Sequence, residues 1–302
     1  MPVDFKRLMA ARFFFSFAVQ MQAIVLGWRM YELTHDPLHL GLIGLVEATP
    51  ALSLALFAGF IVDHSNPLTI YRRVVMVSFT SGLLMLLSQS HLLDLATNIQ
   101  VVLLFTSSFL TGCARAFSQP SMYSIVPKII PKALIPTSSA WMSSAMQVSR
   151  ISGPAFGGLL YGFIGVSGTA TVICVSLLLT LTFTFMVKLS HVKKERDPSR
   201  SVKEELLIGA RFVLKHPILF PALTLDMVSV LFGGVTALLP IYAAEILMIG
   251  PKGLGILRAA PAIGAAVMSF VLIRWNIRKN AGKWMLSSVA GFGLSILVFA
   301  VS

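Results

Sequence analysis

Long apolar segments separated by short polar ones dominate the chain. Each apolar segment is about 20 residues long, the length of a helix that crosses the hydrocarbon core of a bilayer. Nine such spans are predicted, at residues 11–33, 39–62, 73–91, 98–117, 140–163, 168–189, 218–246, 253–274 and 283–302. Backbone groups in lipid must be hydrogen-bonded within their own segment, so each span is predicted to be a helix. The alternation typical of membrane β-strands is absent from the sequence.

Basic residues gather in alternate connections between these spans. They occur before the first span and in the connections 2–3, 4–5, 6–7 and 8–9, whereas the connections 1–2, 3–4 and 5–6 contain no Lys or Arg. Cytoplasmic loops of membrane proteins hold an excess of these two residues. The pattern therefore predicts a multi-pass membrane protein whose N-terminus lies in the cytoplasm.

The composition supports a membrane protein and argues against several other classes. Hydrophobic residues make up 56% of the chain and charged residues 12%, whereas soluble domains contain about 25% charged residues. The net charge of +12 comes from residues between apolar blocks, so nucleic-acid binding is not predicted. Cys113 and Cys174 lie inside apolar blocks and are predicted to be inert. The sequence has no nucleotide-binding loop and no histidines at metal-ligand spacing, so no enzyme, cofactor or metal site is predicted.

The connection between the sixth and seventh spans is the longest. Residues 191–201 are polar and are predicted to be a flexible linker. Apolar residues then recur at helical spacing over 202–216, which predicts an amphipathic helix at the cytoplasmic membrane surface. The domains expected are a six-helix bundle at 1–189, a linker at 190–216 and three helices at 217–302.

The third part of the chain repeats the first. The segment 43–51 (IGLVEATPA) resembles the segment 254–262 (LGILRAAPA) at an offset of 211 residues, and the same offset places Tyr31 on Tyr242. Spans 7–9 are therefore predicted to be a second copy of spans 1–3 in the same orientation, as in transporters built from two parallel six-helix repeats. A second copy of only three helices indicates a C-terminally truncated chain or, as an alternative, a natural nine-helix variant.

Two motifs resemble the major facilitator superfamily. Gly59 and Asp63 end the second span and Arg72 and Arg73 open the third, which is similar to the gating motif of that family. Its usual second glycine and a basic residue are replaced here by 64–67 (HSNP).

The fifth span holds Gly153, Pro154, Gly157 and Gly158, which is similar to the antiporter motif of this superfamily. Bare glycine faces allow close helix packing. The resemblance implies that the partner is span 8, which offers small residues between Ala259 and Ala266.

The segment 201–262 is similar to the efflux branch that contains enterobactin-exporter-like and macrolide-efflux-like proteins. The runs 204–213 (EELLIGARFV), 231–240 (LFGGVTALLP) and 253–261 (GLGILRAAP) provide this resemblance. It implies a major facilitator fold in the bacterial inner membrane. It also implies proton-driven antiport of a siderophore, a drug or another amphipathic metabolite by a monomer.

Ionisable residues inside the spans are candidates for the transport pathway, because charge in a membrane is costly. Glu47, Arg150, Asp226, Arg258 and Arg29 meet this description. Glu47 or Asp226 is predicted to exchange protons in competition with substrate, whereas a static ion pair is the structural alternative. Arg258 is the repeat counterpart of Glu47, and Arg29 is predicted to extend its charge to the membrane surface beside Glu32.

The sequence thus predicts a proton-coupled efflux carrier that works by alternating access, with the lipid bilayer, protons and a small molecule as its partners. A truncated membrane protein that does not transport and an uptake symporter are the alternatives.

Overall fold

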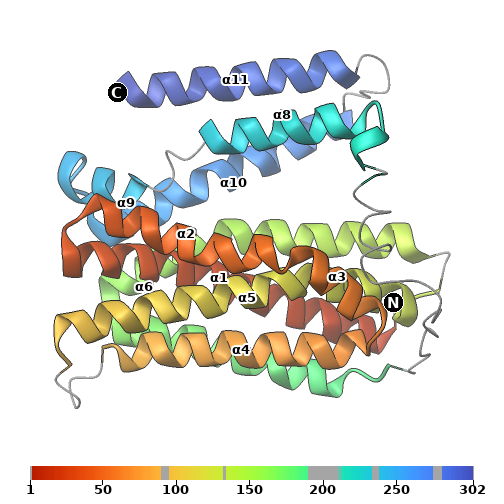
Figure 1. Ribbon diagram of the computed structural model, residues 1–302, viewed down its shortest axis with the longest axis horizontal. Coiled ribbons are helices and arrows are strands. Elements are labelled where there is room, and N and C mark those ends of the chain that lie inside the picture. The colour runs from red at the N-terminus through yellow and green to blue at the C-terminus, as the bar shows by residue number, and fades with distance from the viewer. Residues whose placement is uncertain are drawn as a thin grey trace.

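The computed structural model describes residues 2–89, 95–131, 134–189, 211, 213–232, 238–274 and 281–301 (Figure 1). These residues are helical almost throughout and contain no strand, so the predicted all-α fold is confirmed. The first part of the chain forms α1 (Val3–Thr34), α2 (Pro37–Ser53), α3 (Ala55–Asp63), α4 (Pro67–Leu87), α5 (Thr97–Ile129) and α6 (Ile135–Met186). The second part forms α8 (Leu219–Phe232), α9 (Leu239–Ile241), the π-helix η3 (Tyr242–Ile246), α10 (Gly250–Arg274) and α11 (Ala281–Val301).

Helical segments occupy each predicted span within the described ranges. By length and composition, five of these helices could cross a membrane, or six when α2 and α3 are taken as one span bent by 48°. As one straight helix, the 52 residues of α6 would extend about 78 Å at 1.5 Å per residue, more than twice the bilayer core of about 30 Å. Gly165 interrupts α6 with φ 70° and ψ −176°, a conformation open to glycine alone. The fifth and sixth predicted spans lie on either side of this break.

Several helix boundaries differ from the predicted ones. α1 begins at Val3 rather than at residue 11, and α5 ends at Ile129 rather than at residue 117. Hydropathy marks the apolar core of a helix, but the helix itself continues where its side chains become polar. The predicted linker at 191–201 and most of the amphipathic segment at 202–216 lie outside the described residues.

Polar side chains begin two of the helices. The carboxylate of Asp36 accepts the N–H of Leu38 at 2.9 Å, and the side-chain oxygen of Asn66 accepts the N–H of Leu68 at 3.0 Å. In both cases a proline follows at the first helical position, where its missing N–H costs nothing. The hydrogen bond from Leu38, with a smaller contribution from His39, lowers the pKa of Asp36. These caps explain why α2 and α4 begin directly after their short connections.

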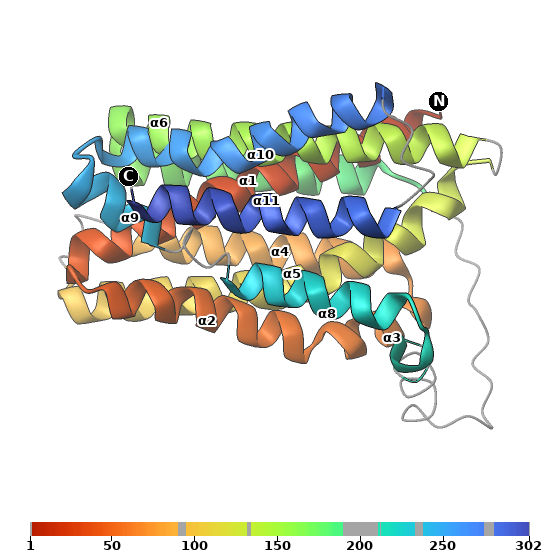
Figure 2. The same ribbon diagram turned by 90° about the horizontal axis from the view of Figure 1, so that it is seen from above.

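The first six-helix group is built around α1. This helix packs against α6, while α5 packs against α2 and α4; Figure 2 shows the same neighbours from above. A buried polar cluster joins α1, α4 and α5, because the amide of Gln22 donates to Ser81 at 2.7 Å and to Ser107 at 3.1 Å. Such interhelical hydrogen bonds hold helices together where lipid provides no hydrophobic driving force.

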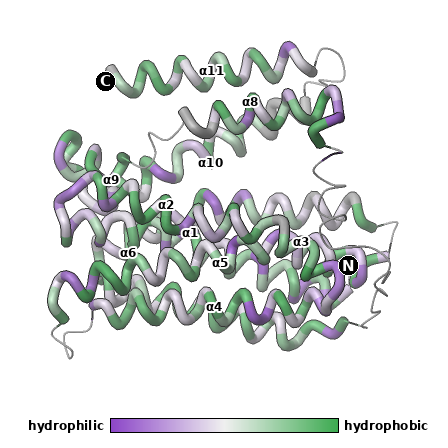
Figure 3. Tube along the Cα trace, viewed as in Figure 1, coloured by the Kyte–Doolittle hydropathy of each residue, from purple (hydrophilic) through white to green (hydrophobic). Residues whose placement is uncertain are grey.

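The helices of the second part lie on one side of this group. α10 packs along α6, and α11 is exposed in its described positions apart from contacts such as that between Tyr242 and Phe299, whose rings are 4.8 Å apart. Apolar positions, green in Figure 3, recur along the length of every helix, with α11 among them. In Figure 1, α10 starts beside α9 and moves away from α1 along its length, toward the end where the N-terminus lies.

Candidate functional site

Three adjoining cavities lie near the centre of the described structure: the first is lined by α1, α5 and α6, and the other two also by Arg258 of α10. Their volumes are about 150, 110 and 360 Å³. Gln20 and Arg150 line both the first and the third, and Arg258 lines the second and the third, so the three form one continuous region. We call this region the arginine cavity, after the residues that line it: Arg12, Arg115, Arg150 and Arg258.

Glu47 is the acidic residue of this cavity. Its carboxylate forms an ion pair with Arg115, and its side chain is 18% exposed. A close approach of α2 to α5 positions it: a Cβ at Gly112 would lie 2.1 Å from the carbonyl oxygen of Glu47. Any larger residue at 112 would push Glu47 away from Arg115. Glu47 and its repeat counterpart Arg258 line the same cavity.

Arg12 is buried, with a relative exposure of 4%. Its guanidinium donates to Ser118 at 3.1 Å and to Gln119 at 2.7 Å, both neutral acceptors on α5. The Nε atom of Arg12 has no partner within the described structure. An arginine at this depth is costly in a membrane protein, so a buried one without a carboxylate indicates a functional site.

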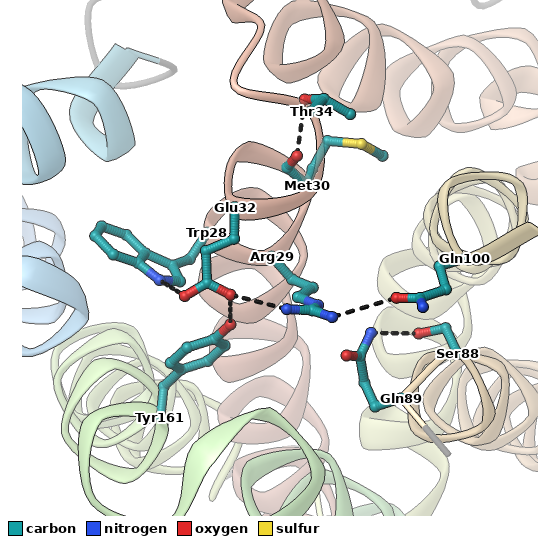
Figure 4. Close-up of polar contacts among 9 residues, drawn as sticks. All are labelled: Trp28, Arg29, Met30, Glu32, Thr34, Ser88, Gln89, Gln100 and Tyr161. Carbon is teal, nitrogen blue, oxygen red and sulfur yellow. Dashed lines mark hydrogen bonds and ion pairs between the residues drawn. The ribbon is translucent and has the colours of Figure 1, made fainter. Parts of the chain in front are cut away.

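A second polar group, the outer cluster, lies at the end predicted to be extracellular. Figure 4 shows its centre: the carboxylate of Glu32 accepts from Trp28, Arg29 and Tyr161. Arg29 donates at 3.1 Å to Glu32 and at 3.2 Å to Gln100 of α5. The cluster thereby connects α1 to α5 and α6, and it contains one positive and one negative charge.

Beside the outer cluster, the hydroxyl of Tyr31 donates to the carboxylate of Glu245. Tyr31 lies on α1 and Glu245 on η3, so this hydrogen bond joins the two helix groups at the outer end. We call this pair the outer clasp. Met248, which follows η3, adopts a left-handed φ of 51° and leads into α10. The short irregular segment thus allows α10 to begin next to the clasp.

The glycines of the antiporter-like motif divide between two neighbours. A Cβ on Gly153 would lie 2.6 Å from the Cβ of Gln20, and one on Gly157 would lie 3.1 Å from the Cα of Met21, so both face α1. A Cβ on Gly158 would lie 2.4 Å from the carbonyl oxygen of Pro251 and 2.7 Å from the Cα of Gly255.

The helix implied as partner, α10, therefore contacts this motif at its first turns. Further along α10, the carbonyl oxygen of Ala262 accepts a hydrogen bond from Gln147 of α6 at 2.9 Å, and Ala259 is buried. Pro154 is buried inside α6, and its carbonyl oxygen lies 2.8 Å from the position of a Cβ on Gly255.

The gating-like motif lies at the opposite end. Asp63 is exposed and accepts a hydrogen bond from Ser124 at 3.4 Å. Arg72 donates at 2.9 Å to the carbonyl oxygen of Thr184, and its guanidinium lies 4.6 Å from the ring of Phe185. Arg72 therefore satisfies the carbonyl end of α6, a favourable place for a cation. Gly59 lies one turn before Asp63 on α3, and Arg73 is exposed on α4.

The structure brings three predicted pathway residues together and leaves two apart. Glu47, Arg150 and Arg258 line the arginine cavity. Arg29 belongs to the outer cluster, and Asp226 is exposed on α8 and lines none of the three cavities. Arg12 and Arg115 were not among the predicted pathway residues, because they lie close to the ends of the predicted spans 11–33 and 98–117. Arg12 lies nine residues inside α1, about 14 Å from its start, and this depth was the missing signal.

A family model described as "Transmembrane secretion effector" matches residues 3–302. The chain is 25% identical over 283 residues to the staphyloferrin A transporter of Staphylococcus aureus (strain NCTC 8325 / PS 47), and the alignment covers 91% of this chain and 68% of that protein. It is 26% identical over 176 residues to the uncharacterized MFS-type transporter YvqJ of Bacillus subtilis (strain 168), covering 56% of this chain and 41% of that protein.

Among solved structures, the fold is similar to that of a bacterial homolog of the human lysosomal transporter Spinster, in its inward-facing and unoccupied conformation. The TM-score is 0.64 at 16% sequence identity, and the match covers 92% of this chain and 64% of that one. The chain thus spans less than two thirds of the length of this protein and of YvqJ.

Proposed function

The chain belongs to the transmembrane secretion effector family of the major facilitator superfamily, and on that premise we propose that it performs proton-coupled efflux of a small molecule. Homologues that are MFS-type transporters support a transporter rather than an enzyme. The proposed location is the bacterial inner membrane, with the N-terminus in the cytoplasm. The proposed organisation is a bundle at 1–189, a linker at 190–216 and a second helix group at 217–302, acting as a monomer.

The observation that supports this proposal most strongly is a charged cavity closed at one end. The outer clasp between Tyr31 and Glu245 holds the two helix groups together beyond the cavity, and Gly158 packs on Gly255 nearby. Away from that end, α10 separates from α1 (Figure 1). A solute would enter from the cytoplasmic side and leave outward after the clasp opens, as in alternating access between two bundles.

Glu47 is the proposed site of proton exchange. Its ion pair with Arg115 holds α2 to α5 in the present conformation. Protonation would remove the negative charge of Glu47 and release Arg115 into the cavity. Asp226, the second predicted candidate, stays a prediction, and its exposure on α8 favours Glu47.

The test uses inverted membrane vesicles that contain the full chain and a trapped pH indicator. A panel of siderophores (staphyloferrin A first, because of the relative), cationic drugs and organic acids is added to vesicles with an acidic interior. We expect at least one compound to drive proton release and to accumulate inside. Glu47→Gln should abolish the proton signal, and Asp226→Asn should reduce it less.

The orientation of the vesicles separates the alternatives. Accumulation in right-side-out vesicles alone would identify an uptake symporter. Absence of flux for every compound in both orientations, with normal membrane insertion, would contradict transport by this chain and favour the non-transporting alternative.

A further inference from the structure

We propose that the arginine cavity binds a small solute with two or more oxyanion groups, either carboxylate or phosphate, as the exported substrate. The claim that this solute is exported rests on the proposed function. The claim that the cavity binds it does not. It narrows the substrate from any amphipathic molecule to a hydrophilic anion.

The first step is the balance of charge. Four arginines line the three adjoining cavities, whereas Glu47 is the one acidic residue among their lining residues. Arg115 forms an ion pair with Glu47. Three guanidinium groups therefore have no carboxylate in the cavity. Because arginine stays protonated in proteins, this positive charge persists at every physiological pH.

The second step compares Arg12 with other arginines that lie partly buried in the helix groups. Elsewhere in the described structure Arg7 pairs with Asp4, and Arg29 pairs with Glu32. Arg72 lies against the carbonyl end of α6. Arg12 is as buried as any of these, yet its partners are the neutral side chains of Ser118, Gln119 and Met146.

The third step is unused hydrogen-bonding capacity. The Nε atom of Arg258 is buried without a hydrogen-bond partner in the described structure. Guanidinium groups bind planar oxyanions with two parallel hydrogen bonds, and such bidentate pairs are stronger than neutral ones. Ser16, Gln20 and Gln119 supply neutral polar groups in the same cavity. A polycarboxylate or a phosphate ester would satisfy these donors together.

A cationic substrate does not fit this arrangement. The excess positive charge of the lining arginines would repel it, most strongly near the buried Arg12. A neutral apolar substrate would leave the buried arginine donors unpaired, which is costly. The apolar lining residues Phe15, Val19, Leu239 and Pro261 can still contact the carbon frame of an anion.

The test measures equilibrium binding to the purified full chain in phosphatidylcholine nanodiscs. Isothermal titration calorimetry is performed with acetate, succinate and citrate, a series of increasing charge, with inorganic phosphate as a second oxyanion, and with tetraphenylphosphonium as the cation. We expect affinity to increase from acetate to citrate, to fall with salt, and to be absent for tetraphenylphosphonium. Equal affinity across the carboxylates, or binding of the cation alone, would overturn the proposal.

Matched variants assign the binding to the cavity. Arg150→Gln should weaken citrate binding about 10- to 100-fold, the loss expected for one charge-assisted hydrogen bond. Arg150→Lys, which keeps the charge, should weaken it less. Lys128→Gln removes the same charge from an exposed position in the last turn of α5 and should leave binding unchanged. An equal loss in Arg150→Gln and Lys128→Gln would contradict a specific site.

Two further arms separate the sources of the anion and the two proposals. Loss of citrate binding in nanodiscs that contain phosphatidylglycerol would assign the site to a lipid headgroup and overturn the solute proposal. If anions bind in an arginine-dependent way but no flux occurs in vesicles, the binding proposal stands and the proposed transport function is contradicted. If cationic or neutral compounds are transported and Arg150→Gln does not change their flux, the transport function stands and the binding proposal is contradicted.

Discussion

The outer cluster and the arginine cavity both contain arginine and glutamate, but they differ in whether the charges balance. In the outer cluster, Arg29 and Trp28 donate to the carboxylate of Glu32, so the charges cancel. In the cavity, four arginines accompany Glu47 alone. Apart from Arg258 on α10, the charged residues of both regions lie on helices that could cross a membrane, where unpaired charge is costly. The difference indicates that the outer cluster stabilises a closed end, whereas the cavity is arranged for a ligand.

The largest effect is expected when the cavity is made to resemble the outer cluster. Gln20→Glu keeps the shape of the side chain and adds a carboxylate beside Arg150, which lines the same two cavities. We expect citrate affinity to fall at least about 100-fold, because like charges in a binding site cost several kcal/mol. The melting temperature of the ligand-free protein should rise, because an unpaired cation gains a partner.

Calorimetry and thermal unfolding in detergent measure these two changes. Gln20→Met, which keeps the size of the side chain and adds no charge at the same position, is the control for disturbed packing. A Gln20→Glu variant that binds citrate as the wild type does would show that the cavity charge is irrelevant to binding.

A smaller effect, on stability, is expected at the contact between Gly158 of α6 and the first turns of α10. Gly158→Ala would place a Cβ 2.4 Å from the carbonyl oxygen of Pro251. We expect a loss of about 1–3 kcal/mol of stability, as for other overpacked contacts. Gly264→Ala is the matched control on α10, because a Cβ there meets nothing within 4 Å. Thermal unfolding of both variants measures this loss, and Gly158→Ala should melt at the lower temperature. Equal melting temperatures would show that α6 and α10 are not in tight contact at Gly158.

The smallest effect is expected in the outer cluster itself. Glu32→Gln removes the acceptor charge from Arg29 while keeping the size of the side chain. Because the side chains of Arg29 and Glu32 are 23% and 35% exposed, solvent screens the pair, and we expect a loss of about 1 kcal/mol. Citrate binding should not change. Weakened citrate binding in Glu32→Gln would show that the two regions are not separate.

The sequence was sufficient for the fold and for part of the site. Apolar length predicted the spans, and the repeat at offset 211 placed Glu47 and Arg258 at equivalent positions, which face one cavity in the structure. Glycines in the fifth span predicted a close contact with the eighth, and Gly158 makes it with Gly255.

The remaining features depend on tertiary geometry that no local pattern reports. Hydropathy placed Arg12 and Arg115 close to the ends of predicted spans, whereas the long helices α1 and α5 carry both into the cavity wall. In the sequence, Asp226 and Arg150 are both charged residues within predicted spans. Only the packing of their helices shows that Arg150 lines the cavity and Asp226 does not. The division of the glycine motif between α1 and α10 likewise depends on how α6 lies between them.

Access to the cavity depends on the outer clasp, and the accessibility of one cysteine can test this dependence. Ala262 lines the cavity on α10, and Met248 is 82% exposed at the outer end. Ala262→Cys and Met248→Cys are each placed in a chain with Cys113→Ala and Cys174→Ala, and are treated with a membrane-impermeant thiol reagent.

With the clasp intact, the cysteine at 262 should react in inverted vesicles and not in right-side-out vesicles, whereas the cysteine at 248 should show the opposite pattern. Adding Tyr31→Phe should allow the cysteine at 262 to react from both sides, because the hydrogen bond to Glu245 is lost. Reaction of the cysteine at 262 from the outer side with Tyr31 in place, or from neither side, would contradict a cavity open to the cytoplasm and closed by the clasp.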